Sequence, residues 1–434
     1  MSAVFYRDPH TVYPAIARGQ GVYLWDTAGK RYFDGASGAL VANLGHGRED
    51  VARVLYEQAR MVALAHTLRF TSPALERFAE RVSRVAGAPG WHIYPVSGGS
   101  EATETAVKLA RHIQLTRGQG GRYRVLSRRA SYHGNTLGAL AASGLAERKR
   151  VYEPLLAEAF AQVAPPSAAC AGVGPDGSCG CLAAFSEEIA RVGADSVAAV
   201  IVEPVGGSAR SGFVAHAGYL AGLRRLCDTH GILLIFDEVM SGFGRTGRWM
   251  AFHHDAGAVP DLITAAKGLA AGYAPLGAVL IANPLYEATF AEGSAFTHGF
   301  TYSGNPVSAA VGDQVLRIVE EQGLVECAAR EGARLRAGLE ALALTYGWIR
   351  TVRGRGLMLG LLLADRPGLA AAVAGSAWEQ GLILYQGHGD AEGGDGEHLL
   401  VAPPLVIQPA ETDELLARTG DACAAVDASL PPMR

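Results

Sequence analysis

The sequence lacks the features that direct a protein to a membrane or to nucleic acid. No apolar run approaches the roughly 20 residues that a membrane-spanning helix needs. The opening segment, "MSAVFYRDPH", has neither the basic nor the apolar region of a signal peptide. Lysine and arginine number 38 against 42 aspartates and glutamates, so no basic excess indicates nucleic acid or an anionic membrane. We therefore expect a cytoplasmic protein that binds neither.

Cysteine is also scarce, with six residues in a chain of 434. This number excludes a disulfide framework as the main source of stability. Cys170, Cys179 and Cys181 lie close together in the sequence. A structural zinc site has four ligands, whereas this stretch offers three. We interpret it as a surface loop with reduced thiols and predict no metal site.

Apolar residues are abundant, at 49% of the chain against 18% charged residues. Runs such as "SVAAVIVEPV" and "ILLIFDEV" are typical of parallel strands that are buried on both faces, and helical patterns separate them. This alternation predicts an α/β fold with a mainly parallel central sheet between helices. We place the large domain at 61–315 and a smaller α+β domain at 1–60 together with 316–434.

Chemically useful side chains stand at three of the predicted strand ends. Asp237 closes one strand, Lys267 follows a second, and a Ser-Gly-Gly-Ser turn that contains Gly99 and Ser100 leads from a third strand into a helix. Ligands of such sheets collect at the carboxyl ends of the strands. We therefore expect these groups to meet at one edge of the sheet.

Each group suits one part of a pyridoxal phosphate cofactor. The glycine turn exposes backbone N–H groups to a phosphate, although the same turn is also an ordinary helix cap. Lys267 lies among small apolar residues, where desolvation lowers the pKa of an amine and prepares it for Schiff-base chemistry; a lysine that reaches the surface is the alternative. A carboxylate such as Asp237 can keep a pyridine nitrogen protonated.

The segment Leu233–Tyr273 resembles the signature of class III (ω-amino-acid type) aminotransferases, which are pyridoxal-phosphate enzymes of fold type I. Its Asp-Glu-Val, Gly-Phe-Gly-Arg-Thr-Gly, Pro-Asp and Lys-Gly elements stand at the family's spacing. Further blocks, among them "VSGGSEATETAVKLAR" and "HGFTYSGNPVSAA", follow the family's order along nearly the whole chain. The resemblance implies transfer of an amino group from an ω-amino acid or amine to pyruvate or 2-oxoglutarate by a ping-pong mechanism. A pyridoxal-phosphate-dependent decarboxylase or aminomutase is the alternative.

The resemblance also implies roles for individual residues. Lys267 matches the Schiff-base lysine and general acid/base, and Asp237 matches the partner of the pyridine nitrogen. The remaining cofactor contacts would come from Gly99, Ser100, Tyr132, His133, Val239 and Thr301. Thr301 matches a residue that reaches the cofactor of the neighbouring subunit, which implies a homodimer with shared active sites, with a higher oligomer as the alternative.

The expected substrate pocket departs from the family pattern. Leu400 stands where many members have an arginine for the α-carboxylate of glutamate, so Glu203 lacks its usual partner. Leu40 stands where pyruvate-using members have a tryptophan. We therefore expect donors with a distal ammonium group that pairs with Glu203, unless an arginine from elsewhere, such as Arg210 or a residue of the other subunit, takes that place.

Overall fold

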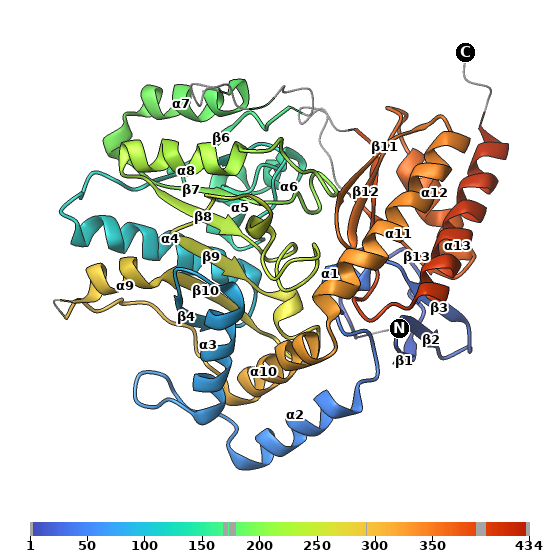
Figure 1. Cartoon of the computed structure of the whole chain (residues 1–434), viewed down its shortest axis with the longest axis horizontal. Coiled ribbons are helices and arrows are strands. Elements are labelled where there is room, and N and C mark those ends of the chain that lie inside the picture. Colours follow the sequence, from blue (N-terminus) through green and yellow to red (C-terminus); the bar gives the residue numbers. More distant parts are fainter. Residues whose placement is uncertain (1–2, 168–171, 173–178, 292, 388–395, 431–434) are drawn as a thin grey trace.

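The computed structural model describes residues 3–167, 172, 179–291, 293–387 and 396–430. The described residues form a large α/β part and a smaller α+β part that lie next to each other (Figure 1). No helix among them is long and apolar enough to cross a membrane.

A seven-stranded sheet forms the centre of the large part. Its strands, in spatial order, are β4 (Trp91–Val96), β10 (Gly277–Ala282), β9 (Leu262–Ala265), β8 (Leu233–Asp237), β7 (Val197–Val202), β5 (Arg124–Arg128) and β6 (Phe160–Val163). Neighbouring strands from β9 to β6 run parallel, whereas β10 runs antiparallel to both of its neighbours. Every residue of β7 and β8 is buried, as their continuous apolar sequences require. The mainly parallel sheet predicted from the sequence is therefore confirmed.

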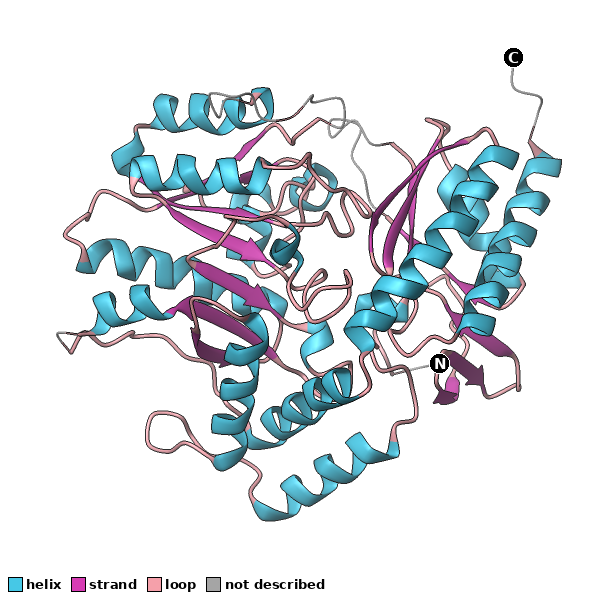
Figure 2. Ribbon diagram, viewed as in Figure 1, coloured by secondary structure: helices cyan, strands magenta, loops and turns pink. Residues whose placement is uncertain are grey.

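Helices pack around this sheet and at the junction with the smaller part (Figure 2). They are α1 (Ser37–Leu40), α2 (Glu49–Met61), α3 (Pro73–Ala86), α4 (Gly99–Thr116), α5 (Leu137–Ala142), α6 (Ala146–Arg150), α7 (Gly180–Val192), α8 (Tyr219–His230), α9 (Asn283–Phe290) and α10 (Pro306–Glu321). The longest helix that contacts the sheet, α4, begins directly after β4, so its N-terminus lies at the carboxyl edge of the sheet.

The smaller part joins the two ends of the chain. One of its sheets has the order β1 (Ile16–Gln20), β2 (Tyr23–Asp26), β3 (Arg31–Asp34) and β13 (Leu382–Ile383); the other has the order β11 (Ile349–Arg355), β12 (Met358–Leu363), β15 (His398–Val401) and β14 (Tyr385–Gln386). The helices α11 (Leu324–Thr345), α12 (Leu369–Glu379) and α13 (Pro409–Ser429) accompany these sheets. Because β3 pairs with β13, N-terminal and C-terminal segments share one sheet. The domain boundaries given above stay a prediction.

The expectation of a surface loop around the cysteines is wrong for the two cysteines that the structure describes. Cys179 and Cys181 are 9% and 8% exposed and belong to the main apolar core. They are buried because α7 begins here and packs against α8. Cys170 lies outside the described residues.

Candidate active site

Three strand ends converge on one cavity. β4, β8 and β9 point in the same direction, so their carboxyl ends share an edge of the sheet. The cavity there has a volume of about 160 Å³, roughly ten times what one water molecule requires, so an organic molecule can enter. Of the residues expected from the sequence, those that line it are Gly99, Ser100, Tyr132, His133, Glu203, Asp237, Val239 and Lys267. Gly134, Val205 and Met240 also line it and were not expected.

Lys267 begins a short 3-10 helix directly after β9. Its φ of 42° is a strained value for a residue with a side chain, and such strain is concentrated at functional sites. Desolvation lowers the pKa of its amine to about 8, although the charges of Asp237 and Glu203 oppose the shift. About half of the amine is therefore neutral, and nucleophilic, near pH 8.

Asp237 is 5% exposed and is held by two donors. Its Oδ2 lies 2.7 Å from Nδ1 of His133, which donates to the carboxylate, and its Oδ1 accepts a bond from the Val239 N–H at 3.1 Å. These bonds offset the cost of burying the carboxylate. Nε2 of His133 is buried and has no hydrogen-bond partner among the described residues.

The N-terminus of α4 forms the anion-binding side of the cavity. No side chain caps this 18-residue helix, so its first N–H groups remain available to a ligand. Gly99 lies close to Val239: a Cβ at this position would come within 3.1 Å of Val239 Cγ1. Ser100 Oγ accepts a bond from the Asn135 N–H at 3.0 Å, which fixes the hydroxyl beside these N–H groups.

Tyr132 and Thr301 differ in their positions relative to the cavity. Tyr132 lines it, and the guanidinium of Arg148 lies 5.0 Å from the centre of its ring. Burial raises the pKa of the Tyr132 phenol. Thr301 is exposed and is not one of the residues that line the cavity of its own chain.

Glu203 is a buried carboxylate with few partners. Its Oε1 accepts a bond from the Gly207 N–H at 3.1 Å, and burial raises its pKa. No ion pair joins it to another residue in the part of the chain that the structure describes. Arg210 instead donates to the Pro166 carbonyl, and Arg128, which sequence reasoning missed, donates to the backbone carbonyl of Glu203.

Leu40 and Leu400 come together in a small apolar cluster. They are 1% and 0% exposed, and Val205 and Met240, which line the cavity, pack in the same cluster. Leu40 and Leu400 are not themselves among the cavity-lining residues. They therefore affect the shape of the cavity indirectly, because they pack in the same cluster as residues that line it.

Arg245 holds the segment after β8 in place. Its fully buried guanidinium donates to four groups: the carbonyls of Leu357 and Pro403, Ser37 Oγ and Asn43 Oδ1. Neighbouring Glu238 accepts bonds from Ser241 and from the Phe252 N–H, and burial raises its pKa to about 7. Both residues thus support the backbone around Asp237 and do not face the cavity.

Comparisons with known proteins agree with this geometry. The model of the aminotransferase class-III family matches residues 5–422. The chain is 36% identical to the uncharacterized aminotransferase YodT of Bacillus subtilis (strain 168), with 97% of each chain covered. It is also 36% identical to the acetylornithine aminotransferase of Xanthomonas axonopodis pv. citri (strain 306), with 93% of this chain and 91% of that one covered.

The fold agrees with solved structures of such enzymes. An amine transaminase from an uncultivated Pseudomonas species, solved in its PLP-bound form, is 32% identical and has a TM-score of 0.88. The similarity covers 98% of this chain and 99% of that one. The chain therefore belongs to the class III aminotransferases, which are pyridoxal-phosphate-dependent enzymes of fold type I.

Proposed function

We propose that this enzyme moves an amino group from an ω-amino acid or amine donor to a keto acid, pyruvate or 2-oxoglutarate, by a ping-pong mechanism. One observation carries the proposal: an amine with a lowered pKa, that of Lys267, and a buried carboxylate, that of Asp237, line the same cavity. The relatives named above are transaminases, which supports amine transfer over a decarboxylase or aminomutase reaction.

The cavity offers a suitable group for each part of the cofactor. The N–H groups at the start of α4, with Ser100, would hold the phosphate. The Lys267 amine would bond to the aldehyde carbon, and Asp237 would pair with the ring nitrogen. Tyr132 and Val239 would contact the two ring faces. When bound, the cofactor supplies an electron sink for the carbon that carries the amino group.

The protein's own groups then control protons and charge. Because its pKa is about 8, Lys267 Nζ can both accept and donate a proton near neutral pH. It would take the proton from the substrate carbon and donate it to a different carbon atom. His133 and the Val239 N–H hold the charge of Asp237 in a fixed position. This fixed charge needs no rearrangement during the reaction, which is how a preorganised site lowers a barrier.

The substrate preference is proposed from Glu203. A carboxylate that is buried without an ion pair among the described residues is stabilised by an ammonium group that enters the cavity. We therefore propose a preference for donors with a distal ammonium group, such as a diamine, and weak reaction with glutamate. Leu40 and Leu400, which lie in the apolar cluster next to the cavity, offer no positive charge to the α-carboxylate of a substrate such as glutamate.

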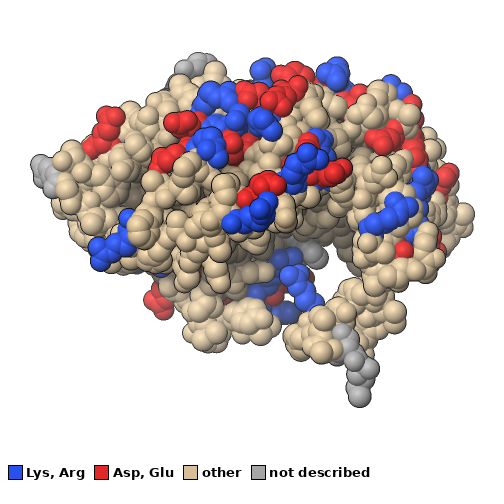
Figure 3. All heavy atoms as spheres, turned by 90° about the horizontal axis from the view of Figure 1, so that it is seen from below, with Lys and Arg blue, Asp and Glu red and all other residues tan. Residues whose placement is uncertain are grey.

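We also propose a homodimer with shared active sites. Thr301 is exposed, and its segment is tied by the Asn305 side chain to the carbonyl of Ala63. Large apolar side chains are exposed next to it: Met61, Val62, Leu64, Leu68, Phe70 and Tyr302. The face on the side of α2 carries charges of both signs between large areas with neither (Figure 3). A two-fold interface here would bury these side chains and bring Thr301 of the partner subunit to the phosphate.

A donor and acceptor panel tests the reaction. Purified enzyme is incubated with each amine and keto acid pair, and both the new amino acid and the consumed keto acid are quantified. A transaminase consumes one keto acid for each amine converted. Release of carbon dioxide without consumption of keto acid would instead identify a decarboxylase.

A further inference from the structure

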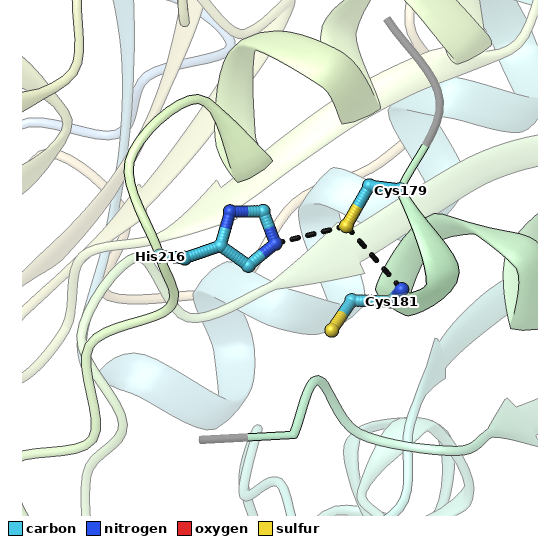
Figure 4. Close-up of side chains that lie close together, drawn as sticks. All are labelled: Cys179, Cys181 and His216. Carbon is cyan, nitrogen blue, oxygen red and sulfur yellow. Dashed lines mark hydrogen bonds between the residues drawn. The ribbon is translucent and has the colours of Figure 1, made fainter. Parts of the chain in front are cut away.

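Outside the active site, two cysteines and a histidine form a cluster of ligand groups (Figure 4). The sulfur atoms of Cys179 and Cys181 and a ring nitrogen of His216 all lie within 4.8 Å of one another. Cys179 Sγ is 2.9 Å from His216 Nε2. Both thiols are more than nine-tenths buried, and the imidazole is half-buried.

The separations come close to those in a tetrahedral zinc site. Zn–S bonds of about 2.3 Å and Zn–N bonds of about 2.0–2.1 Å place neighbouring ligand atoms about 3.5–3.8 Å apart. Cys179 Sγ and His216 Nε2, which are 2.9 Å apart, are closer than this, and the other separations in the cluster are at most 4.8 Å. Small side-chain rotations are therefore enough to bring the three groups around one ion.

Both cysteines lie at the start of one helix. Cys179 is the N-cap of the 13-residue helix α7, and Cys181 lies in its first turn. The Cys181 N–H donates to Cys179 Sγ at 3.3 Å. The backbone therefore holds the two sulfur atoms on the same side of the helix start, and the thiolate is the form of cysteine that binds zinc.

His216 is also oriented as a metal ligand. Its Nδ1 lies 3.0 Å from the carbonyl oxygen of Ala217, which can only accept, so Nδ1 carries the proton. The lone pair of Nε2 therefore points toward Cys179, as the dashed line in Figure 4 shows. A ligating histidine almost always donates its other ring N–H to a carbonyl or carboxylate in this way.

We propose that Cys179, Cys181 and His216 bind Zn²⁺. Binding displaces the protons of both thiols, so two thiolates and a neutral imidazole balance the two charges of the ion, and the buried site is neutral overall. The fourth coordination position is left to a ligand from outside these three residues. This site is separate from the proposed amine-transfer site and involves no redox chemistry, because Zn²⁺ does not change its oxidation state.

The ion would fix one border of the active site. The segment from Glu203 to His216 begins at the cavity and ends at the cluster, and Val205 pairs with Val214 within it. Zinc would therefore join the start of α7 to the far end of the segment that carries Glu203. We assign the ion this structural role.

Metal analysis of tag-free holoenzyme, grown with added zinc, tests the proposal. We expect about one zinc per chain by mass spectrometry, with X-ray absorption showing at least two sulfur ligands and one imidazole nitrogen. Cys179→Ser, Cys181→Ser and His216→Gln should each reduce the zinc content at least tenfold. Cys227→Ser, which changes another buried cysteine, is the matched control and should retain the zinc.

A second measurement tests the proposal even if some of these variants fold poorly. Zinc added to metal-free, reduced wild-type enzyme should raise its melting temperature, whereas zinc should not raise that of His216→Gln. Wild-type enzyme that binds no zinc under reducing, anaerobic conditions overturns the proposal. So does zinc that remains after both cysteines are replaced. Neither result depends on the amine-transfer activity, so this proposal and the proposed function can fail separately.

Discussion

Asp237 and His133 form a buried pair at the carboxyl edge of the sheet, with Oδ2 and Nδ1 2.7 Å apart and exposures of 5% and 3%. β8 ends at Asp237, whereas His133 comes from the segment between β5 and α5. The backbone N–H of His133 donates to the Ser143 hydroxyl, and the backbone carbonyl of His133 accepts a bond from the Thr103 hydroxyl. Because the ring is fixed in this way, the carboxylate keeps one orientation toward the cavity.

Replacing Asp237 with Asn should remove the charge while leaving the shape of the site. We expect kcat to fall by about 10²–10³, the usual loss when one preorganised electrostatic group is removed. Cofactor content should stay near that of wild type, because Lys267 and the start of α4 are unchanged. Steady-state kinetics with saturating donor and acceptor, together with cofactor quantification, provide the check. Asp195→Asn, on the surface, is the control, and near-normal turnover of Asp237→Asn would exclude the proposed role.

The depressed pKa of Lys267 should be visible in the stability of the apoenzyme. Folding lowers this pKa from 10.5 to about 8, so the unfolded chain binds more protons between these pH values and wild-type stability rises with pH there. Below pH 8 the protonated amine destabilises the folded state. Lys267→Met should therefore be more stable than wild type at pH 7, by on the order of 1–3 kcal/mol.

This gain should disappear as the pH rises from 8 toward 10.5. Urea unfolding of cofactor-free protein at several pH values measures it. Lys108→Met, at an exposed helical position, should show no comparable gain. A pH-independent difference between Lys267→Met and wild type would mean that the amine is not desolvated in the apoenzyme.

The contact between Gly99 and Val239 predicts a defect that a second mutation repairs. Gly99→Ala places a Cβ 3.1 Å from Val239 Cγ1, so the start of α4 or the Val239 side chain must shift. We expect cofactor affinity to fall at least severalfold, and Gly99→Ala with Val239→Gly should recover part of the loss. Gly98→Ala is a matched control, because a Cβ there meets nothing within 4 Å. The check is to measure the cofactor dissociation constant of each variant. If Gly99→Ala binds the cofactor as tightly as wild type does, the cofactor does not bind beside Gly99.

Thr301 tests the shared active site. If Thr301 of the partner subunit binds the phosphate, Thr301→Ala should release cofactor more easily, and dilution that separates subunits should release it in wild type. Sedimentation and cofactor content, measured together over a range of protein concentrations, would show both effects. Thr345→Ala, another exposed threonine, should change neither. A fully active monomer would contradict the proposed dimer.

Sequence reasoning works best where the physical signal is local. The continuous apolar runs of β7 and β8 are typical of parallel strands buried on both faces, and a residue that ends such a strand, as Asp237 does, stands at the carboxyl edge of the sheet. Other strands cannot be recognised in this way, for example β6, a four-residue edge strand, and β11, "IRTVRGR", which is half-exposed and rich in arginine. Neither has the uninterrupted apolar pattern that identifies a buried strand.

The remaining site residues depend on contacts between distant segments. His216 lies 37 residues beyond Cys179, so no local motif connects it with the cysteines. Val205 and Met240 read as ordinary apolar residues, and only the course of the loops after β7 and β8 brings them to the cavity. Arg128 ends a strand as Asp237 does, but nothing in its own segment indicates that it donates to Glu203.

The least conventional expectation concerns Glu203 and the choice of donor. Burial raises the pKa of this carboxyl group, and no ion pair holds it in the described part of the chain, so an ammonium group in the cavity would stabilise its charged form. A diamine supplies that charge, whereas a neutral primary amine does not and glutamate adds another negative group. Wild-type kcat/KM should therefore follow the order diamine, neutral amine, glutamate. Glu203→Gln removes the charge but keeps the size, and it should reduce the diamine-to-neutral-amine ratio by about tenfold or more, since a buried charge-assisted bond contributes about 1.5–3 kcal/mol. Glu187→Gln, outside the cavity, should leave the ratio unchanged. If Glu203→Gln also leaves it unchanged, or if glutamate is the best donor, Glu203 does not select the substrate.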